Sequence, residues 1–170
     1  MKVAAVKHTD NPLEWTKMFN DHGIEIIEKD CHDKNSFIEL LKNVDGALIY
    51  SLPITDREVL EACPKLKVVS RGGVGVDSVD VNAATELGIC VCNTPGINTT
   101  EVADHAVAML LSLTRNIREQ DSLIKKGTWA DNPKELATFR TINRRIAGNT
   151  VGIIGFGDIG RAFASRMRGF

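Results

Sequence analysis

The stretch KVVSRGGVGVDSVDVNAATELGICVC, residues 67–92, decides the fold. It contains an apolar strand, Lys67–Ser70, then a glycine-rich turn and a short helix over about Asp80–Leu87 that Gly88 ends. A second apolar strand, Ile89–Cys92, follows at once. Two buried strands joined by one helix form a right-handed crossover, so the stretch predicts two parallel strands in one sheet.

The same alternation of strand and helix extends toward the N-terminus. Apolar runs predict three more strands, and helical patterns with caps and glycine stops separate them. The strands are expected over 2–7, 24–28 and 47–50, and the helices over 12–22, 36–42 and 55–63. Five strands linked in this way predict an α/β fold with a doubly wound parallel sheet in flavodoxin-like order.

Composition excludes several classes of protein. The 170 residues carry 21 Lys and Arg against 22 Asp and Glu, so no basic stripe is available for nucleic acid. The longest apolar-rich run, Ala106–Leu113, is far shorter than the roughly 20 residues that cross a membrane. The start of the chain has only Val3–Val6 as an apolar run, too short for a signal peptide. We therefore expect a cytoplasmic protein that binds neither nucleic acid nor membrane.

The four cysteines contain no C-x-x-C pair. Cys90 and Cys92 share one face of a strand, and such a pair can bind a metal. Because no second Cys or His pair lies nearby, the sequence favours buried thiols in a strand and predicts no metal site.

The regular alternation stops after Asn93. Thr99 or Thr100 can cap a helix that runs to about Lys126, where Gly127 ends it. Its first half is apolar on most sides, so something beyond the first domain must cover it. We expect a helix between two domains or in a homodimer interface, followed over 127–147 by a mostly irregular crossing segment.

The segment TVGIIGFGDIG, residues 150–160, resumes the pattern with an apolar strand and a G-x-G-x-x-G motif before a helix. In that context Gly155 allows the tight turn, Gly157 lets a pyrophosphate approach, and Gly160 lets helix and strand pack closely. The N–H groups of Asp158 and Ile159 then point at the phosphates. The alternative to a pyrophosphate-binding loop is an ordinary glycine-rich turn between strand and helix.

The dinucleotide fingerprint is incomplete within these 170 residues. An acidic residue about 20 positions after the last glycine would contact the ribose, and further strands would complete the sheet. We therefore expect NAD as cofactor without excluding NADP, and we expect a chain cut inside its second domain.

A second glycine-rich loop, Arg71 to Asp77, follows the strand Lys67–Ser70 at the sheet edge where such folds bind ligands. Its exposed backbone N–H groups suit a small carboxylate, and the alternative is a tight turn without a ligand. Asp77 is expected to tie the loop or cap the next helix. Arg71 can contact a substrate or form a surface ion pair.

Three motifs carry a resemblance to the D-isomer-specific 2-hydroxyacid dehydrogenase family. They are RGGVGVDSVDVNAATELGICVCNTPG, TTEVADHAVAMLLSLTR and GNTVGIIGFGDIGRAFA, and their spacing is similar to that of the C-terminal-binding-protein-like and phosphoglycerate-dehydrogenase-like branch. The resemblance implies a flavodoxin-like substrate domain over 1–98, a long interdomain or dimer helix with its crossing segment over 99–147, and the start of an NAD-binding Rossmann domain over 148–170.

The resemblance also implies the roles of particular residues. Backbone amides of Gly73, Val74 and Gly75 are expected to bind the substrate carboxylate, and Val74 and Val102 are expected to contact the cofactor. The pyrophosphate is expected to lie against Gly155, Phe156, Gly157, Asp158, Ile159 and Gly160.

The implied function is that of an oxidoreductase that moves a hydride between NAD(H) and a small 2-hydroxy or 2-oxo acid. The family's catalytic Arg, Glu and His lie in a second half that these residues do not match, and His105 falls on an apolar helix. No catalytic residue is therefore expected in this chain, which is expected to be an inactive N-terminal portion. The alternative is a non-enzymatic module that dimerises through the helix after Thr99, or a truncated relative.

Overall fold

The computed structural model describes residues 1–7 and 15–170, and they form two compact units, Met1–Ile97 and Asn98–Phe170. The N-terminus of the first predicted helix, at Asn11 and Pro12, lies outside the described residues. Each unit is considered by itself.

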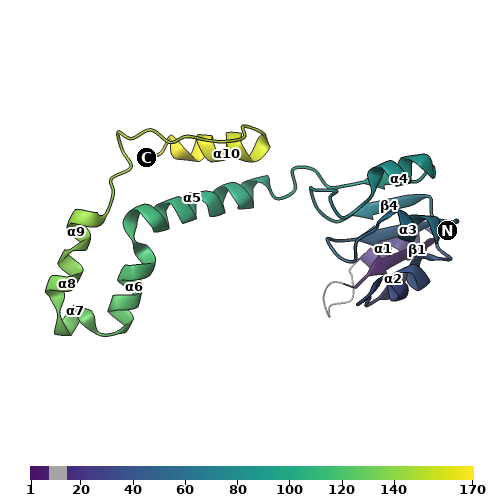
Figure 1. Ribbon diagram of the computed structural model, residues 1–170, viewed down its shortest axis with the longest axis horizontal. Helices are drawn as coiled ribbons and strands as arrows, with labels where there is room; N and C mark the ends of the chain where they lie inside the picture. Colours follow the sequence, from purple (N-terminus) through teal and green to yellow (C-terminus); the bar gives the residue numbers. More distant parts are fainter. Residues whose placement is uncertain (8–14) are drawn as a thin grey trace. The chain divides into compact units, whose positions relative to one another are not determined.

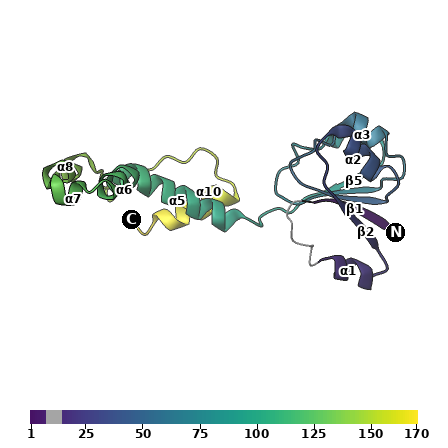
Figure 2. The same cartoon turned by 90° about the horizontal axis from the view of Figure 1, so that it is seen from below.

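The first unit is built on a five-stranded parallel sheet in the order β2-β1-β3-β4-β5. This is the flavodoxin order, so the predicted α/β class and topology are confirmed. Figure 2 shows α1 on one side of the sheet and α2 and α3 on the other. The strands are β1 (Lys2–Val6), β2 (Glu25–Lys29), β3 (Gly46–Ile49), β4 (Val68–Arg71) and β5 (Cys90–Cys92); the helices are α1 (Trp15–Asp21), α2 (Lys34–Leu41), α3 (Arg57–Glu61) and α4 (Val81–Glu86).

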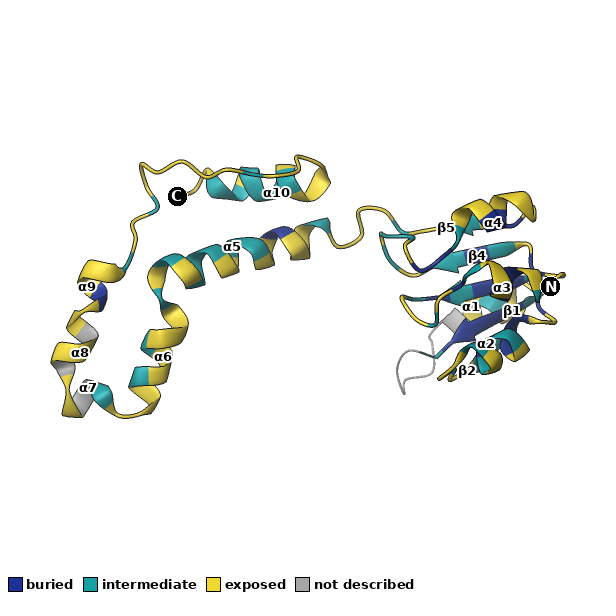
Figure 3. Cartoon of the chain, viewed as in Figure 1, coloured by how far each residue is buried: buried dark blue, intermediate teal, exposed yellow. Residues whose placement is uncertain are grey.

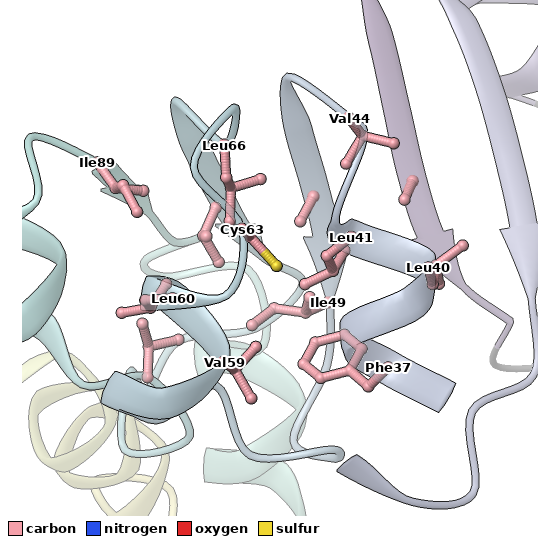
Figure 4. Close-up of a cluster of buried hydrophobic side chains, with 14 of the residues drawn as sticks. Phe37, Leu40, Leu41, Val44, Ile49, Val59, Leu60, Cys63, Leu66 and Ile89 are labelled. Carbon is pink, nitrogen blue, oxygen red and sulfur yellow. The ribbon is translucent and has the colours of Figure 1, made fainter. Parts of the chain in front are cut away.

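The core of this unit lies between the sheet and helices α2 and α3. Phe37 and Leu41 of α2 and Val59 of α3 are fully buried against Ile49 of β3 (Figure 4). The central strands are apolar along their length because helices cover both faces of a parallel sheet. This packing positions the ends of the strands, where the loops of the candidate site begin.

Local hydrogen bonds set the helix starts. Asp33 accepts from the Ser36 N–H at the start of α2, and Asp56 accepts from the Val59 N–H at the start of α3. The ammonium of Lys34 lies 2.7 Å from a carboxylate oxygen of Asp56, and this hydrogen bond, with the Val59 N–H, lowers the pKa of Asp56. The two helices on the same side of the sheet are therefore tied at their N-termini.

The cysteine prediction for β5 is wrong. Cys90 and Cys92 are exposed, with their Sγ atoms 3.9 Å apart, because β5 is the edge strand of the sheet. The contact with Cys90 raises the pKa of the Cys92 thiol. Among residues 1–7 and 15–170, no three His, Cys, Asp or Glu side chains gather as a metal-ligand set.

The second unit is mostly helical, and its first helix is shorter than predicted. The chain forms α5 (Thr99–Arg115), then breaks at Asn116, and continues as α6 (Ile117–Lys125). Asn116 adopts φ 52°, and its side-chain amide donates to Asn143 Oδ1 at 2.9 Å. A left-handed residue ends the helical hydrogen-bond ladder, so one long helix becomes two.

The start of this helix differs from the sequence expectation, whereas its end agrees with it. The N-cap of α5 is Asn98 rather than Thr99 or Thr100, and its side chain makes no capping hydrogen bond. Gly127, at φ 81°, does follow the end of α6 as predicted. Within the described part of the chain, no helix has the length and apolar character to span a bilayer.

The crossing segment is more ordered than predicted. It contains three short helices, α7 (Thr128–Asp131), α8 (Pro133–Ala137) and α9 (Phe139–Ile142), with Phe139 buried. The last helix, α10 (Asp158–Met167), packs along α5 (Figure 1), and Arg166 of α10 pairs with Asp104 of α5.

The strand predicted over 150–154 is not formed. The segment has no strand partner, and Ile154 is fully exposed. A β-strand exists only through hydrogen bonds to a neighbouring strand, and no strand is described in the second unit. Figure 3 shows this contrast: β1 and β3 of the first unit are largely buried, whereas α10 and the segment before it are intermediate or exposed. The helix half of the expected βα unit is therefore present without its strand.

Candidate functional site

The first unit carries a pocket at the carboxyl ends of its central strands. Its volume is about 380 Å³, and its walls are Val6, Lys7, Tyr50, Ser51, Leu52 and Gly72. These residues end or follow β1, β3 and β4. In the order β2-β1-β3-β4-β5, strands after β2 are added on the other side of β1, so the strand order reverses between β1 and β3. Open α/β sheets bind ligands at such a position.

The glycine-rich loop after β4 borders this pocket, and neighbouring side chains explain two of its glycines. A Cβ at position 72 would lie 2.8 Å from Cε1 of Tyr50, and one at position 73 would lie 1.7 Å from Nη1 of Arg71. The Tyr50 ring and the Arg71 guanidinium therefore lie directly on the loop backbone. Val74, which follows, is exposed.

The segment after β5 holds the loop in place. The Asn93 side-chain amide donates to the Val74 carbonyl at 2.7 Å, and the Thr94 N–H donates to the Gly73 carbonyl at 3.0 Å. These two hydrogen bonds tie the carbonyl groups of Gly73 and Val74 to the segment after β5. No role was predicted for Asn93 from the sequence. The signal that could have identified it is a polar residue directly after a strand at the binding edge of the sheet.

Arg71 is placed between the pocket and the loop. Its Nη2 donates to Ser51 Oγ at 2.8 Å, while its Nε is buried and has no hydrogen-bond partner. No carboxylate pairs with Arg71 in the part of the chain that the structure describes. The alternative of a surface ion pair therefore receives no support from these residues.

The second unit contains the G-x-G-x-x-G loop. Gly155 has φ 89°, a backbone conformation that favours glycine, and Gly157 is the N-cap of α10. A Cβ at position 160 would lie 2.3 Å from the Gly155 carbonyl oxygen, whereas one at position 157 would meet nothing within 4 Å. The third glycine is thus required for close packing, and the second leaves open space in front of the helix N-terminus.

The acidic side chain of Asp158, in the first turn of α10, is paired with an arginine. Asp158 Oδ1 lies 2.5 Å from Nη2 of Arg161, which also donates through Nη1 to the Phe156 carbonyl at 3.2 Å. The Asp158 carboxylate is therefore engaged with the first turn's own arginine. The backbone N–H groups at the start of α10 and the helix dipole remain suited to an anion.

The remaining predicted residues lie on α5 in the second unit. Val102 is in the first turn and is partly exposed, and its N–H donates to the Asn98 carbonyl at 3.0 Å. His105 is exposed on the same helix, in the turn after Val102. The predicted substrate residues Gly73, Val74 and Gly75 thus share one loop, and Gly155 to Gly160 share another.

The comparisons with known proteins identify the family. The sequence profile of the D-isomer specific 2-hydroxyacid dehydrogenase catalytic domain matches residues 4–163, and the chain belongs to this family. It is 34% identical to a glyoxylate reductase from Thermococcus litoralis, over 91% of this chain and 50% of that protein. It is also 38% identical to a D-3-phosphoglycerate dehydrogenase from Mycobacterium leprae, over 100% of this chain and 31% of that protein.

Two solved structures of oxidoreductases are similar to this chain. The chain resembles an NAD-dependent formate dehydrogenase from Staphylococcus aureus in complex with NAD, with a TM-score of 0.81 and 30% identity over 98% of this chain and 53% of that one. It resembles an acyclic imino acid reductase in complex with NADPH and D-Arg, with a TM-score of 0.83 and 27% identity over 99% of this chain and 53% of that one. The chain spans half or less of the length of these curated relatives and about half of these solved chains.

Proposed function

We propose that the protein that carries this chain transfers a hydride between NAD(H) and a small 2-hydroxy or 2-oxo acid. The observation that carries the proposal is the loop at the start of α10, where Gly160 is too close to the Gly155 carbonyl for any side chain and Gly157 faces open space. These are the two packing properties that a pyrophosphate-binding βα turn requires. Family membership and the activities named for the relatives point the same way.

Each of three segments of the chain is given its own role. We assign residues 1–98 to a substrate domain, 99–147 to an interdomain and dimer segment, and 148–170 to the start of a cofactor domain. When bound, the dinucleotide supplies the hydride chemistry. The N–H groups of Asp158 and Ile159 bind its pyrophosphate, with Gly155, Phe156, Gly157 and Gly160 forming the rest of the turn.

On the substrate side, the N–H groups of Gly73, Val74 and Gly75 bind the carboxylate of the 2-hydroxy acid. Asn93 and Thr94 already hold the carbonyls of this loop, so substrate binding requires little rearrangement there. Val74 and Val102 contact the cofactor. Groups that move the hydroxyl proton are expected in the portion of the relatives that these 170 residues do not match.

The choice between NAD and NADP is a separate proposal. We favour NAD, although the two solved structures compared above carry NAD in one case and NADPH in the other. Fluorescence titration of the full-length protein with NADH and with NADPH tests this choice. Tighter binding of NADPH would contradict it.

Turnover tests the main proposal. The full-length protein is expected to oxidise NADH with glyoxylate or hydroxypyruvate, while the 170-residue chain is expected to give no steady oxidation. A full-length protein that binds NADH but reduces no 2-oxo acid would instead favour the non-enzymatic binding module.

We also propose that the protein forms a homodimer through α5 and α6. Met109, Leu113, Ile117 and Ile124 are exposed there, with Leu113 at 78%, and apolar groups on helices are commonly covered by a partner. A Leu113→Asp variant is expected to sediment as a monomer where the unmodified protein sediments as a dimer. The cytoplasmic location stays a prediction, which cell fractionation with an antibody against the protein can test.

A further inference from the structure

We propose that Cys90 and Cys92 of β5 form a redox-active dithiol, which a low-molecular-weight disulfide such as glutathione disulfide oxidises to an intrachain disulfide bond. Closure of this bond shortens the end of β5 and moves the segment that holds the loop Gly73 to Gly75. The thiol chemistry is independent of the proposed function. Only its effect on substrate binding rests on that function.

The two thiols lie on one face of β5 and touch each other. Successive residues of a strand point to opposite faces of the sheet, and Val91 packs against the buried core. Cys90 and Cys92 therefore lie together on the other face, with their Sγ atoms 3.9 Å apart. Both are exposed, so a small oxidant can reach them. An accessible thiol beside a second thiol that can resolve a mixed disulfide is the arrangement typical of redox-sensitive cysteines.

The position of β5 in the sheet allows the strand to adjust when the bond forms. Cα atoms two residues apart in a parallel strand are about 6.6 Å apart, twice the rise per residue. Disulfides have Cα–Cα distances of about 4.4 to 6.8 Å, so the extended strand lies at the upper end of that range. Because β5 is hydrogen-bonded to β4 and no described strand pairs with its other edge, the backbone at Val91 can bend outward.

The reaction is thiol–disulfide exchange in two steps. The Cys90 thiolate attacks one sulfur of glutathione disulfide, which forms a mixed disulfide and releases one glutathione as its thiolate. Cys92 then attacks Sγ of Cys90, which forms the intrachain bond and releases the second glutathione. The two protons of the protein thiols pass through solvent to the released glutathiones. Two protein thiols are thus oxidised while one small disulfide is reduced.

The order of the two thiols follows from their contact. Only the thiolate form of a cysteine is a nucleophile. The contact with Cys90 raises the pKa of the Cys92 thiol, so Cys92 retains its proton and acts second. Cys90 is therefore assigned the first attack, and Cys92 is assigned the resolution of the mixed disulfide.

The residues directly after the dithiol hold the substrate loop. Asn93 follows Cys92 and donates to the Val74 carbonyl at 2.7 Å, and the Thr94 N–H donates to the Gly73 carbonyl at 3.0 Å. A bond that draws Cys92 toward Cys90 moves Asn93 with it. Oxidation is therefore expected to weaken both hydrogen bonds to the loop.

Peptide mapping tests whether the bond forms. The full-length protein is incubated with glutathione disulfide, its free thiols are alkylated, and it is digested with trypsin. The tryptic peptide 72–115 contains Cys90 and Cys92 and no other cysteine. It is expected to escape alkylation and to be lighter by two hydrogen atoms than the reduced peptide. Reduced glutathione in excess is expected to reverse the change, because an exposed disulfide is easily reduced.

Variants identify the thiols. In Cys92→Ser, Cys90 is expected to retain a mixed disulfide with glutathione, since no resolving thiol remains. Cys31→Ser is the matched control, because it removes a partly exposed thiol outside the pair and leaves the intrachain bond able to form. The buried Cys63 is an internal control that should stay reduced, and melting temperatures confirm folding. Alkylation of both cysteines in peptide 72–115 after oxidant treatment, or two mixed disulfides without ring closure, would overturn the proposal.

Hydrogen exchange tests the effect on the loop without any need for turnover. The Thr94 amide is protected by its hydrogen bond to Gly73, so its exchange reports on that contact. Loss of one hydrogen bond is expected to speed its exchange about 2- to 12-fold in the oxidised protein. The double variant Cys90→Ser, Cys92→Ser should show no response to the oxidant. Unchanged exchange in a protein whose peptide 72–115 is oxidised would overturn the effect on the loop.

Kinetics then separate this inference from the proposed function. If the loop binds the 2-oxo acid, the KM of the oxidised protein is expected to be about 2- to 12-fold higher than that of the reduced protein. If oxidation changes the exchange of Thr94 but the protein reduces no 2-oxo acid, the dithiol stands and the proposed function fails. Turnover with an equal KM in both forms, together with altered exchange, would contradict the substrate role of the loop and leave the dithiol supported.

Discussion

Substitution of Gly160 by alanine tests the cofactor loop directly. The new Cβ would lie 2.3 Å from the Gly155 carbonyl oxygen, about 0.7 Å inside the 3.0 Å that real Cβ atoms keep, and the oxygen belongs to the backbone. The start of α10 must therefore move away from the loop. Overpacking of this kind costs about 1 to 3 kcal/mol. If the same displacement withdraws the helix N–H groups from the pyrophosphate, the Kd for NADH rises about 5- to 150-fold.

Gly157→Ala is the matched control, because it adds the same methyl group three residues earlier. A Cβ there meets nothing within 4 Å, and the residue has φ −76°, which alanine adopts without strain. The variant should fold with unchanged or slightly higher stability. The methyl group would nevertheless fill the space that the pyrophosphate needs, so NADH binding is expected to weaken at least about tenfold.

Both variants are measured in the full-length protein by NADH fluorescence titration, with melting temperature as the test of folding. The expected pattern is loss of stability and affinity in Gly160→Ala and loss of affinity alone in Gly157→Ala. If Gly157→Ala binds NADH with unchanged affinity, the loop does not hold a pyrophosphate, and the proposed function loses the observation that carries it.

Three further predictions concern stability and the substrate loop. Leu41 is fully buried, so Leu41→Ala should lower the free energy of unfolding of the first unit by about 2 to 5 kcal/mol, measured by urea titration. The Lys2 N–H lowers the pKa of Asp45, so the stability that this carboxylate contributes is complete above its unfolded pKa of about 4 and is lost as the pH falls through the lower folded value. The urea concentration at the unfolding midpoint should therefore decrease as the pH is lowered below about 4. In Asp45→Asn this decrease should be less steep. Asn93→Ala removes the hydrogen bond to the Val74 carbonyl and should raise the KM of the 2-oxo acid about 2- to 12-fold with little change in melting temperature; an unchanged KM would contradict the role given to Asn93.

The sheet could be predicted because its signals are local. Each strand is a short apolar run, and each helix between strands has its own cap or glycine stop, as at Gly88, where φ is 71°. Parallel strands joined by crossovers allow few topologies, and the flavodoxin order is one of them. The glycine motifs could be found for the same reason, since their spacing lies within one turn.

The break between α5 and α6 could not be predicted because it depends on a distant residue. The sequence around Asn116 supports a continuous helix up to Gly127. The left-handed conformation of Asn116 accompanies a hydrogen bond to Asn143, which is 27 residues away in the chain. Helical periodicity contains no information about such a contact.

Burial was misjudged where it depends on neighbours. Apolar character predicted strand pairing for residues 150–154 and burial for Cys90 and Cys92, but strand pairing needs a second strand, and burial needs a covering layer. The described residues provide neither for 150–154, and β5 lies at the edge of its sheet. For Arg71 the sequence predicted no burial, and the structure shows that its Nε is buried without a hydrogen-bond partner.

The sequence by itself therefore determined the α/β class, the flavodoxin order and the two glycine loops, because hydrophobic periodicity and glycine spacing act over a few residues. Only the tertiary structure decided which side chains meet at the ends of the strands. Lys7, Ser51 and Arg71 lie far apart in the chain, and they converge because parallel strands end at the same edge of the sheet.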